Sequence, residues 1–181
     1  MKIVSDIMLK ILGWKAVGEM PPVKKSVIIF APHTSYWDGL YGKLFLMQYK
    51  MNYKFLSKKE LFKFPMNIFF KLYGSIPVSN NKEYIDEIVA LYNTSDNLHI
   101  VLSPEGKRAQ TDHWKKGFYY IANRADVPVV VGFMDYKKKE CGIKGVITNT
   151  DDMKETITEI GRLYKDVGAK HPENFTLDKR Y

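Results

Sequence analysis

Short apolar runs alternate along this chain with segments of helical periodicity, and this alternation limits the fold more than any other feature. The runs are β-branched and bounded by polar residues or proline, as buried strands are. The clearest are 27–30, 98–102 and 127–134, and weaker ones are 54–56 and 145–147. Strands that alternate with helices indicate an α/β layered domain, in which we expect helices to flank a mixed, largely parallel central sheet.

Helical spacing is clearest in two segments that follow polar residues at 79–81 and at 150–151. The residues that share one face are Ile85, Ile88, Val89 and Tyr92 in the first segment, and Ile157, Ile160, Tyr164 and Val167 in the second. The chain contains no repeat, low-complexity tract or Gly/Ser-rich linker. We therefore expect residues 1–181 to form a single domain.

The charge balance favours anionic partners. The 181 residues carry 28 Lys and Arg against 20 Asp and Glu, a net charge of +8. Phospholipid head groups, phosphorylated small molecules, acidic carrier proteins and nucleic acid all fit this balance. The one cysteine, Cys141, cannot form an internal disulfide and fits a reducing compartment. No apolar run reaches the length of a spanning helix and no signal-peptide cleavage site follows an apolar segment, so a cytoplasmic protein is expected.

An amphipathic helix is predicted near the N-terminus, within residues 1–20. Its apolar face consists of Ile3, Val4, Ile7, Met8, Ile11 and Leu12, and its polar face of Lys2, Ser5, Asp6 and Lys10. Such a helix suits a membrane interface, and it equally suits docking on the rest of the domain.

The stretch 58–73 mixes aromatic and basic residues. Its apolar members are Leu61, Phe62, Phe64, Met66, Ile68, Phe69, Phe70 and Leu72, and its lysines are Lys58, Lys59, Lys63 and Lys71. This composition suits an anionic lipid surface. A buried helix pair whose lysines reach out to solvent is the alternative.

His33 and Asp38 are the first candidate catalytic residues. Their spacing separates them on a single helix, so they meet only if His33 lies in a loop and Asp38 in the first helical turn. Ser35 is a natural N-cap residue, and the loop after the strand 27–30 would place His33 at the strand end where α/β folds have their sites. The alternative is that Ser35 and Asp38 are simply a capping box that begins a helix.

A second cluster, Ser103-Pro104-Glu105-Gly106-Lys107-Arg108, follows the strand 98–102. It puts a carboxylate, a flexible glycine and two cations at another strand end, where a guanidinium can hold a phosphate through two hydrogen bonds. A solvated turn is the alternative interpretation.

Taken in order, these blocks resemble the glycerol-phosphate and lysophospholipid (lysophosphatidic acid) acyltransferase family, with its His-x4-Asp and Glu-Gly-x-Arg motifs. The matching positions are His33 and Asp38, the segment 57–65, the block 72–78, Glu105-Gly106-x-Arg108, Lys116-Gly117 and the apolar run 127–130. The likeness covers about 25–135, which is the expected motif-bearing core. It implies a glycerolipid-acyltransferase-like fold for the whole chain.

The resemblance implies that His33 is the general base, that Asp38 orients it, and that a fatty acyl group moves from acyl-CoA or acyl carrier protein to a lipid hydroxyl. No cofactor or metal is implied. The implied substrate-binding residues are Glu105, Gly106, Lys107, Arg108, Lys58, Gly74 and Asn80. Asn80 departs from the family, which usually has a phosphate-binding arginine there; Lys82 or Lys58 are possible substitutes. The implied location is the inner face of the cell membrane, with an anionic lipid surface as partner.

Three other classes of protein fit the sequence less well. A serine hydrolase needs a Gly-x-Ser-x-Gly turn, which the sequence lacks. A metal enzyme needs clustered ligands, and His33, His99, His113 and His171 show no such spacing. A basic phosphate- or nucleic-acid-binding module without acyl transfer activity would use the lysine run 137–139, but no recognised nucleic-acid motif accompanies it, so no nucleic acid is expected as a partner.

Overall fold

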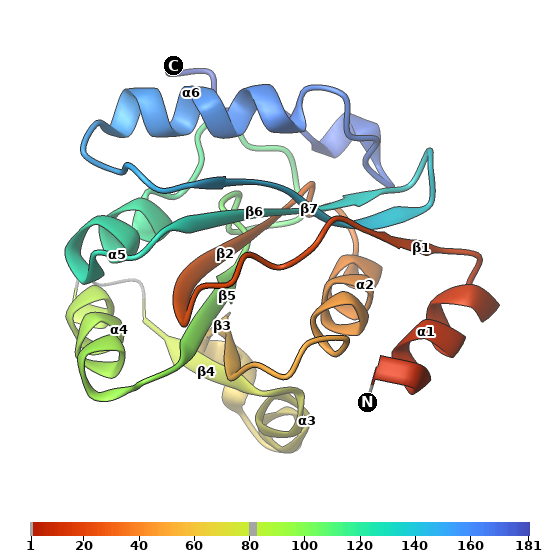
Figure 1. Cartoon of the computed structure of the whole chain (residues 1–181), viewed down its shortest axis with the longest axis horizontal. Helices are drawn as coiled ribbons and strands as arrows, with labels where there is room; N and C mark the ends of the chain where they lie inside the picture. The colour runs from red at the N-terminus through yellow and green to blue at the C-terminus, as the bar shows by residue number, and fades with distance from the viewer. Residues whose placement is uncertain (1, 80–82) are drawn as a thin grey trace.

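The computed structural model describes residues 2–79 and 83–181. Within them, seven strands form one sheet in the order β1-β7-β6-β2-β5-β3-β4, and helices cover both of its faces (Figure 1). β7 runs antiparallel to β6, and every other neighbouring pair is parallel. The prediction of an α/β domain with a mixed, largely parallel sheet is confirmed.

The strands are β1 (Lys15–Val17), β2 (Lys25–Ala31), β3 (Tyr53–Lys58), β4 (Ser75–Val78), β5 (Leu98–Leu102), β6 (Val129–Asp135) and β7 (Glu140–Ile147). The α-helices are α1 (Lys2–Ile11), α2 (Tyr36–Leu46), α3 (Met66–Tyr73), α4 (Glu83–Thr94), α5 (Gly117–Ala125) and α6 (Met153–Tyr164). Two short 3₁₀ helices are η1 (Lys59–Phe62) and η2 (Pro172–Asn174).

Four of the five predicted strand runs lie within β2, β5, β3 and β7, and the fifth, 127–134, overlaps β6. β6 begins two residues later than predicted, because the backbone N–H of Val127 still donates to the carbonyl of Ala122 at the end of α5 (3.0 Å). The predicted helix at 85–92 is α4; of its expected polar start, Asn80 and Asn81 lie outside the described residues. The helix after 150–151 is α6, capped by the side chain of Asp152.

The core has two layers because β2 is covered on both faces. Val27, Ile29 and Ala31 pack into the layer shared with α4, α5 and α6, whereas Ile28 and Phe30 pack into the layer shared with α1 and α2. Side chains alternate between the faces of a strand, so a strand buried on both sides must be apolar at successive positions. This explains why 27–30 is a continuous apolar run.

The topology predicts a ligand-binding crevice beside β2. The neighbouring strands β2 and β5 are parallel, so their C-terminal ends meet at the same edge of the sheet. After β2 the chain enters α2 on one face, and after β5 it enters α5 on the other. In open α/β sheets, ligands bind where successive connections diverge in this way.

α1 docks on the domain through a narrow side that contains Ser5 and Leu9. Ser5 and Leu9 are buried, and the hydroxyl of Ser5 donates to the carbonyl of Leu44 in α2. The apolar side that the sequence defines faces outward, with five exposed residues: Ile3, Val4, Ile7, Met8 and Ile11. α1 therefore docks on the domain, as one predicted alternative has it, and leaves exposed the apolar face that the other alternative assigns to a membrane.

The stretch 58–73 forms the end of β3, η1 and α3. Neither η1 nor α3 has a buried residue, so the alternative of a buried helix pair is also wrong. The exposed apolar residues here are Leu61, Phe64, Met66, Ile68, Phe69 and Leu72. In the part of the chain that the structure describes, no helix is both long enough and apolar enough to span a bilayer.

The close contact between β2 and β6 gives a test of the core. A Cβ added at Gly132 would lie 2.5 Å from the ring of Phe30, whereas a Cβ at Gly161 in α6 would meet nothing within 4 Å. We expect Gly132→Ala to lower the free energy of unfolding by about 1–3 kcal/mol through overpacking. Gly161→Ala should raise it by roughly 0.5–1 kcal/mol, because alanine favours the helix. Urea unfolding measures both; equal effects would contradict this packing.

Candidate active site

The structure brings His33 and Asp38 together in the way their spacing requires. β2 ends at Ala31, His33 lies in the following loop, and Asp38 lies in the first turn of α2. Nδ1 of His33 is 3.3 Å from Oδ2 of Asp38. Because Nδ1 faces the carboxylate, the opposite ring nitrogen, Nε2, is the one left for a substrate. The His33 side chain is 27% exposed, so a ligand in the crevice can reach it.

Asp38 is also the helix cap that the alternative interpretation proposed. Its Oδ2 accepts hydrogen bonds from the backbone N–H groups of Thr34 and Ser35, each at 2.7 Å, and Ser35 is the N-cap residue of α2. The carboxylate is 1% exposed. Its negative charge also lies at the positive end of the α2 dipole. The two interpretations are compatible, since one carboxylate caps the helix and faces His33.

Glu105 supports the His33 loop from the neighbouring strand. Its Oε1 accepts a hydrogen bond from the backbone N–H of His33 at 3.1 Å, and its Oε2 accepts one from the hydroxyl of Ser103 at 2.9 Å. The residue is 3% exposed, and this burial raises the pKa of the carboxyl from 4.5 to about 7 although the His33 N–H opposes the shift. A buried carboxylate that faces backbone is badly placed to bind a phosphate. We therefore revise its predicted role to support of the loop.

Gly106 has a conformational reason to be glycine. Its φ of +67° lies in the left-handed region, and a Cβ there would be 2.8 Å from the side chain of Lys115. The N–H of Lys115 donates to the carbonyl of Pro104 at 2.7 Å, which closes the loop on itself. The turn after β5 is thus a fixed structure that holds Glu105 inward.

Two cations lie over exposed aromatic rings at the start of α2. The guanidinium of Arg108 is 3.6 Å from the ring centre of Tyr36, and the ammonium of Lys170 is 5.4 Å from that of Trp37. Both geometries are typical of cation–π pairs. Because Tyr36 and Trp37 begin α2 directly after the loop that carries His33, both cations lie near that loop.

The other predicted substrate-binding residues differ in their proximity to His33. Lys107 is exposed beside Arg108, and Lys58 is the last residue of β3, two strands from β2 at the same edge of the sheet. Gly74 lies at the opposite end of β4, where its φ of +86° ends α3, so the structure does not bring it to the pair. Asn80 and Lys82 lie outside the described residues.

Sequence reasoning missed Tyr136. Its hydroxyl donates to Oδ1 of Asp38 at 2.6 Å. Tyr136 comes directly after β6, the other neighbour of β2, just as His33 follows β2 and Glu105 follows β5. A polar residue at the end of each central strand was the signal that could have found it.

The remaining candidates are accounted for by the fold. Burial lowers the pKa of His99 to about 4, and its Nδ1 is 2.8 Å from the hydroxyl of Ser26. Burial raises the pKa of the Cys141 thiol to about 12, which suits a structural residue. Within 2–79 and 83–181, no group of three or more His, Cys, Asp or Glu side chains could hold a metal ion.

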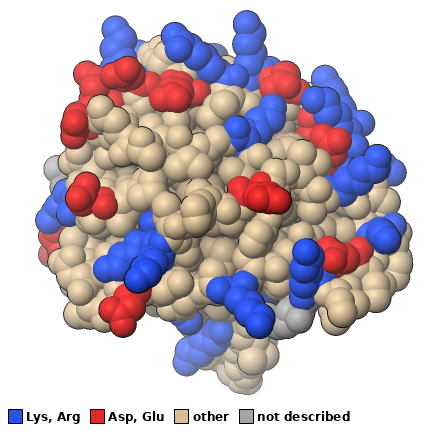
Figure 2. Space-filling model, viewed as in Figure 1, with Lys and Arg blue, Asp and Glu red and all other residues tan. Residues whose placement is uncertain are grey.

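On the face seen in Figure 2, charge is spread rather than gathered at one point. Figure 2 shows Lys and Arg side chains around the rim of one face, interspersed with fewer acidic ones, and a mostly uncharged middle. The lysine run 137–139 forms the turn between β6 and β7. It lies beside α1, because the N–H of Lys15 donates to the carbonyl of Lys139 (2.9 Å) and the Lys139 side chain approaches Gly13.

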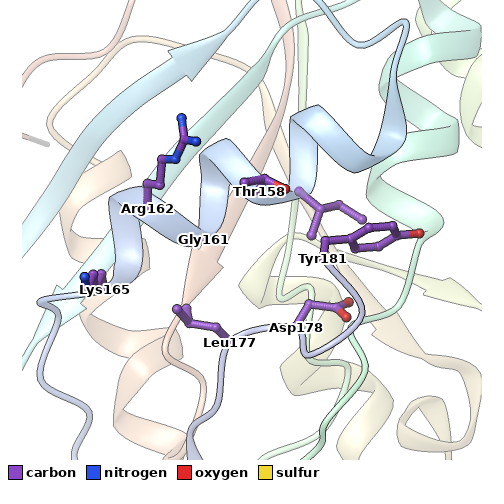
Figure 3. A pocket seen from close by; sticks show the side chains of 8 residues that line it. Thr158, Gly161, Arg162, Lys165, Leu177, Asp178 and Tyr181 are labelled. Carbon is purple, nitrogen blue, oxygen red and sulfur yellow. The ribbon is translucent and has the colours of Figure 1, made fainter.

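A small surface pocket of about 180 Å³ lies elsewhere, between α6 and the C-terminal segment (Figure 3). Its lining residues are Ile157, Thr158, Gly161, Arg162, Lys165, Leu177, Asp178 and Tyr181. None of the predicted site residues is among them.

The fold and the site together define an α/β enzyme whose histidine, backed by a buried carboxylate, can accept a proton from a hydroxyl in the crevice. The family model described as Acyltransferase matches residues 15–132, more than half of the chain. The chain therefore belongs to the Acyltransferase family and is an acyltransferase.

A solved structure shares the fold. The chain is similar to the crystal structure of the 1-acyl-sn-glycerophosphate (LPA) acyltransferase PlsC from Thermotoga maritima, with a TM-score of 0.61 and 17% sequence identity. The match covers 91% of this chain and 75% of that one. No curated protein matches the chain.

Burial of Glu105 predicts an unusual pH dependence of stability. With its pKa raised to about 7 in the folded state and near 4.5 when unfolded, the native protein holds the extra proton between these values. The free energy of unfolding should therefore fall as the pH rises through this window, by about 3 kcal/mol in total. Urea unfolding at pH 5 and pH 8 measures the difference.

Glu105→Gln keeps an oxygen for the His33 N–H and removes the titration, so its free energy of unfolding should change less between the two pH values. Glu87→Gln, on the exposed face of α4, is the matched control and should keep the wild-type dependence. An equal pH dependence in wild type and Glu105→Gln would contradict this account.

Proposed function

We propose that this acyltransferase moves a fatty acyl group from an acyl-CoA or acyl carrier protein thioester to the hydroxyl of a lysophospholipid or a related lipid, in membrane-lipid synthesis. The observation that carries the proposal is the contact between His33 Nδ1 and the buried Asp38 carboxylate at 3.3 Å. It lies in the crevice of a fold shared with a 1-acyl-sn-glycerophosphate acyltransferase.

In the proposed reaction, Nε2 of His33 takes the proton of the acceptor hydroxyl as that oxygen attacks the thioester carbonyl carbon. Asp38 holds the ring with its proton on Nδ1 and stabilises the imidazolium that forms. The tetrahedral intermediate then collapses, the C–S bond breaks, and the thiolate takes the proton from His33. The products are an ester and a free thiol. A base and a thioester suffice for this balance, so the step requires no metal or prosthetic group.

The cations at the crevice suit substrates that carry phosphate. Arg108, with Lys107 beside it, follows β5, and Lys58 lies at the end of β3 at the same edge. We assign these three to the phosphate groups of the acceptor or of the thioester donor, because a guanidinium binds phosphate through two hydrogen bonds and a lysine acts as a point charge. An acidic donor carrier would also be attracted by the net charge of +8.

Peripheral binding to a membrane follows from the outward apolar face of α1. A helix that turns its polar residue Ser5 to the domain and leaves Ile3, Ile7 and Ile11 in water exposes apolar surface that an interface would cover. Lys10 and the adjacent lysine turn at 137–139 put positive charge beside that face, which suits anionic head groups.

η1 and α3 form a second apolar surface on the same side of the sheet as α1, with α2 between the two helices (Figure 1). Here Phe64 and Leu72 are each 82% exposed, and Lys59, Lys63 and Lys71 are exposed among them. Two apolar surfaces on one side, both bordered by lysines, favour a lipid surface over two unrelated contacts. These surfaces support a location at the inner face of the cell membrane for an enzyme that acts on a lipid acceptor.

Removing the base tests the chemistry. His33→Ala should lower the rate of acyl transfer by roughly 10²-fold or more, because a positioned general base contributes about 10² to 10⁴. The far-UV circular dichroism and the melting temperature should stay close to wild type. His113→Ala, at an exposed histidine in the segment between β5 and α5, is the control and should retain activity.

The assay pairs acyl-CoA or acyl-ACP with a panel of lysolipids, and mass spectrometry identifies the product. Full activity of His33→Ala would refute the proposed base.

Removing apolar contacts tests the membrane surface. Phe64→Ser combined with Leu72→Ser should weaken co-sedimentation with vesicles of phosphatidylglycerol and phosphatidylcholine by more than about tenfold, because each buried apolar side chain contributes about 1.5–3 kcal/mol. Leu91→Ser, on α4 at the opposite face, is the matched control. If the two proteins bind vesicles equally well, η1 and α3 do not contact the lipid.

A further inference from the structure

Asp38 divides its two oxygens between different tasks. Oδ2 caps α2 and faces His33, whereas Oδ1 accepts the hydroxyl of Tyr136 at 2.6 Å. Among the described residues, the hydrogen bond to Oδ1 is donated by Tyr136. A buried carboxylate oxygen without a donor costs more than an ordinary lost hydrogen bond. The Tyr136 hydroxyl therefore determines how the carboxylate is turned as well as how it is solvated.

Tyr136 is itself held from three sides. Its ring packs edge-on against Trp14, with ring centres 4.9 Å apart, and against Tyr41, at 5.9 Å. Its backbone N–H donates to the carbonyl of Gly168 at 2.8 Å, in the segment that follows α6. A donor fixed in this way keeps one direction, so it can fix the carboxylate that it binds.

We propose that Tyr136 is a positioning residue of the active site. Its hydroxyl holds Asp38 in the rotamer that points Oδ2 at His33, and it takes up part of the carboxylate charge that the imidazole would otherwise face. This role adds a residue to the proposed active site, and the expected change in kcat rests on the proposed function. Residue 136 lies outside the 15–132 that the family model matches, so the family does not supply this role.

Tyr136 remains a donor at any working pH. Burial raises its pKa far above the ordinary value, and the neighbouring Asp38 carboxylate raises it further. The other ionisable groups around the pair are Glu105 from the loop after β5, Tyr41 from α2 and Lys170 from the segment after α6. Of these, Lys170 carries a positive charge, and Tyr41 is a neutral phenol whose pKa burial raises.

Tyr136→Phe tests the proposal because it keeps the ring contacts and removes the hydroxyl. With more of the Asp38 charge facing it, the protonated His33 ring should persist to higher pH in this variant than in wild type. The titration of the His33 ring, followed by ¹⁵N NMR of histidine-labelled protein, measures this without any substrate. The acid limb of the kcat/KM profile should move in the same direction.

In the acyl-transfer assay, kcat of Tyr136→Phe should fall roughly tenfold, as expected for loss of a charge-assisted hydrogen bond that orients the base. KM should change by less than about twofold, because Tyr136 acts through Asp38 and not on the substrate. In an Asp38→Asn background, Tyr136→Phe should have little further effect on kcat, since the two side chains act as one unit.

Tyr92→Phe is the matched control. Its hydroxyl is buried too, donates to the carbonyl of Ser26 at 2.7 Å and accepts the N–H of Ile100, but it lies among core residues away from the pair. Its loss should lower the melting temperature and leave the His33 titration unchanged. A lower melting temperature in Tyr136→Phe without a change in the His33 titration would overturn the positioning role and leave a structural one.

The two proposals fail separately. If no variant and no wild-type sample transfers acyl groups, the proposed function is wrong, and the His33 titration still decides whether Tyr136 positions the pair. If wild type is active and Tyr136→Phe matches it in kcat and in the His33 titration, the positioning role is wrong and the proposed function stands.

Discussion

Burial of the Asp38 carboxylate is the constraint on which the arrangement around β2 depends. A charge removed from water must have its lone pairs occupied. This one accepts hydrogen bonds from two backbone N–H groups and a tyrosine hydroxyl, and it faces Nδ1 of an imidazole. These partners come from the turn after β2 and from the end of β6, and Asp38 itself lies in the first turn of α2. Satisfying one carboxylate therefore fixes three segments relative to one another, and the contact with His33 is one of the interactions that do so.

The sheet makes this convergence possible. Because β6, β2 and β5 are parallel neighbours, their C-terminal ends deliver Tyr136, His33 and Glu105 to one edge. Glu105 then holds the His33 backbone while Asp38 faces its ring. The histidine is thus supported through its main chain from one neighbouring strand and through its side chain from α2. Because the main chain and Nδ1 of His33 are both held in this way, Nε2 is the ring nitrogen that remains for a substrate.

Those parts of the fold and site that depend on local interactions could be predicted from the sequence. The strands of the central sheet, the N-cap at Ser35 and the approach of His33 to Asp38 all depend on residues close together in the chain, so periodicity and capping rules could find them. Tyr136 lies 98 positions from Asp38, and only strand order brings the two together. Helical spacing found the exposed apolar face of α1 but not the side that docks, which contains Ser5 and Leu9. The docked side depends on a distant partner, since the Ser5 hydroxyl donates to the carbonyl of Leu44. The sequence predicted that Glu105 belongs to the site. It could not predict that its carboxyl points inward, because burial depends on the tertiary fold.

The double duty of Asp38 has a consequence for how such a chain can change over evolutionary time. Replacing His33 removes the base and leaves the helix cap in place, whereas replacing Asp38 removes the base's support and the α2 cap together, and strands the Tyr136 hydroxyl in a partly buried site. Descendants that lose catalysis and keep a binding role can therefore replace the histidine with little loss of stability. They still need the aspartate, because folding depends on it. In relatives of this architecture, the presence of the aspartate would indicate only that the fold requires it. The presence of the histidine would indicate that catalysis is retained.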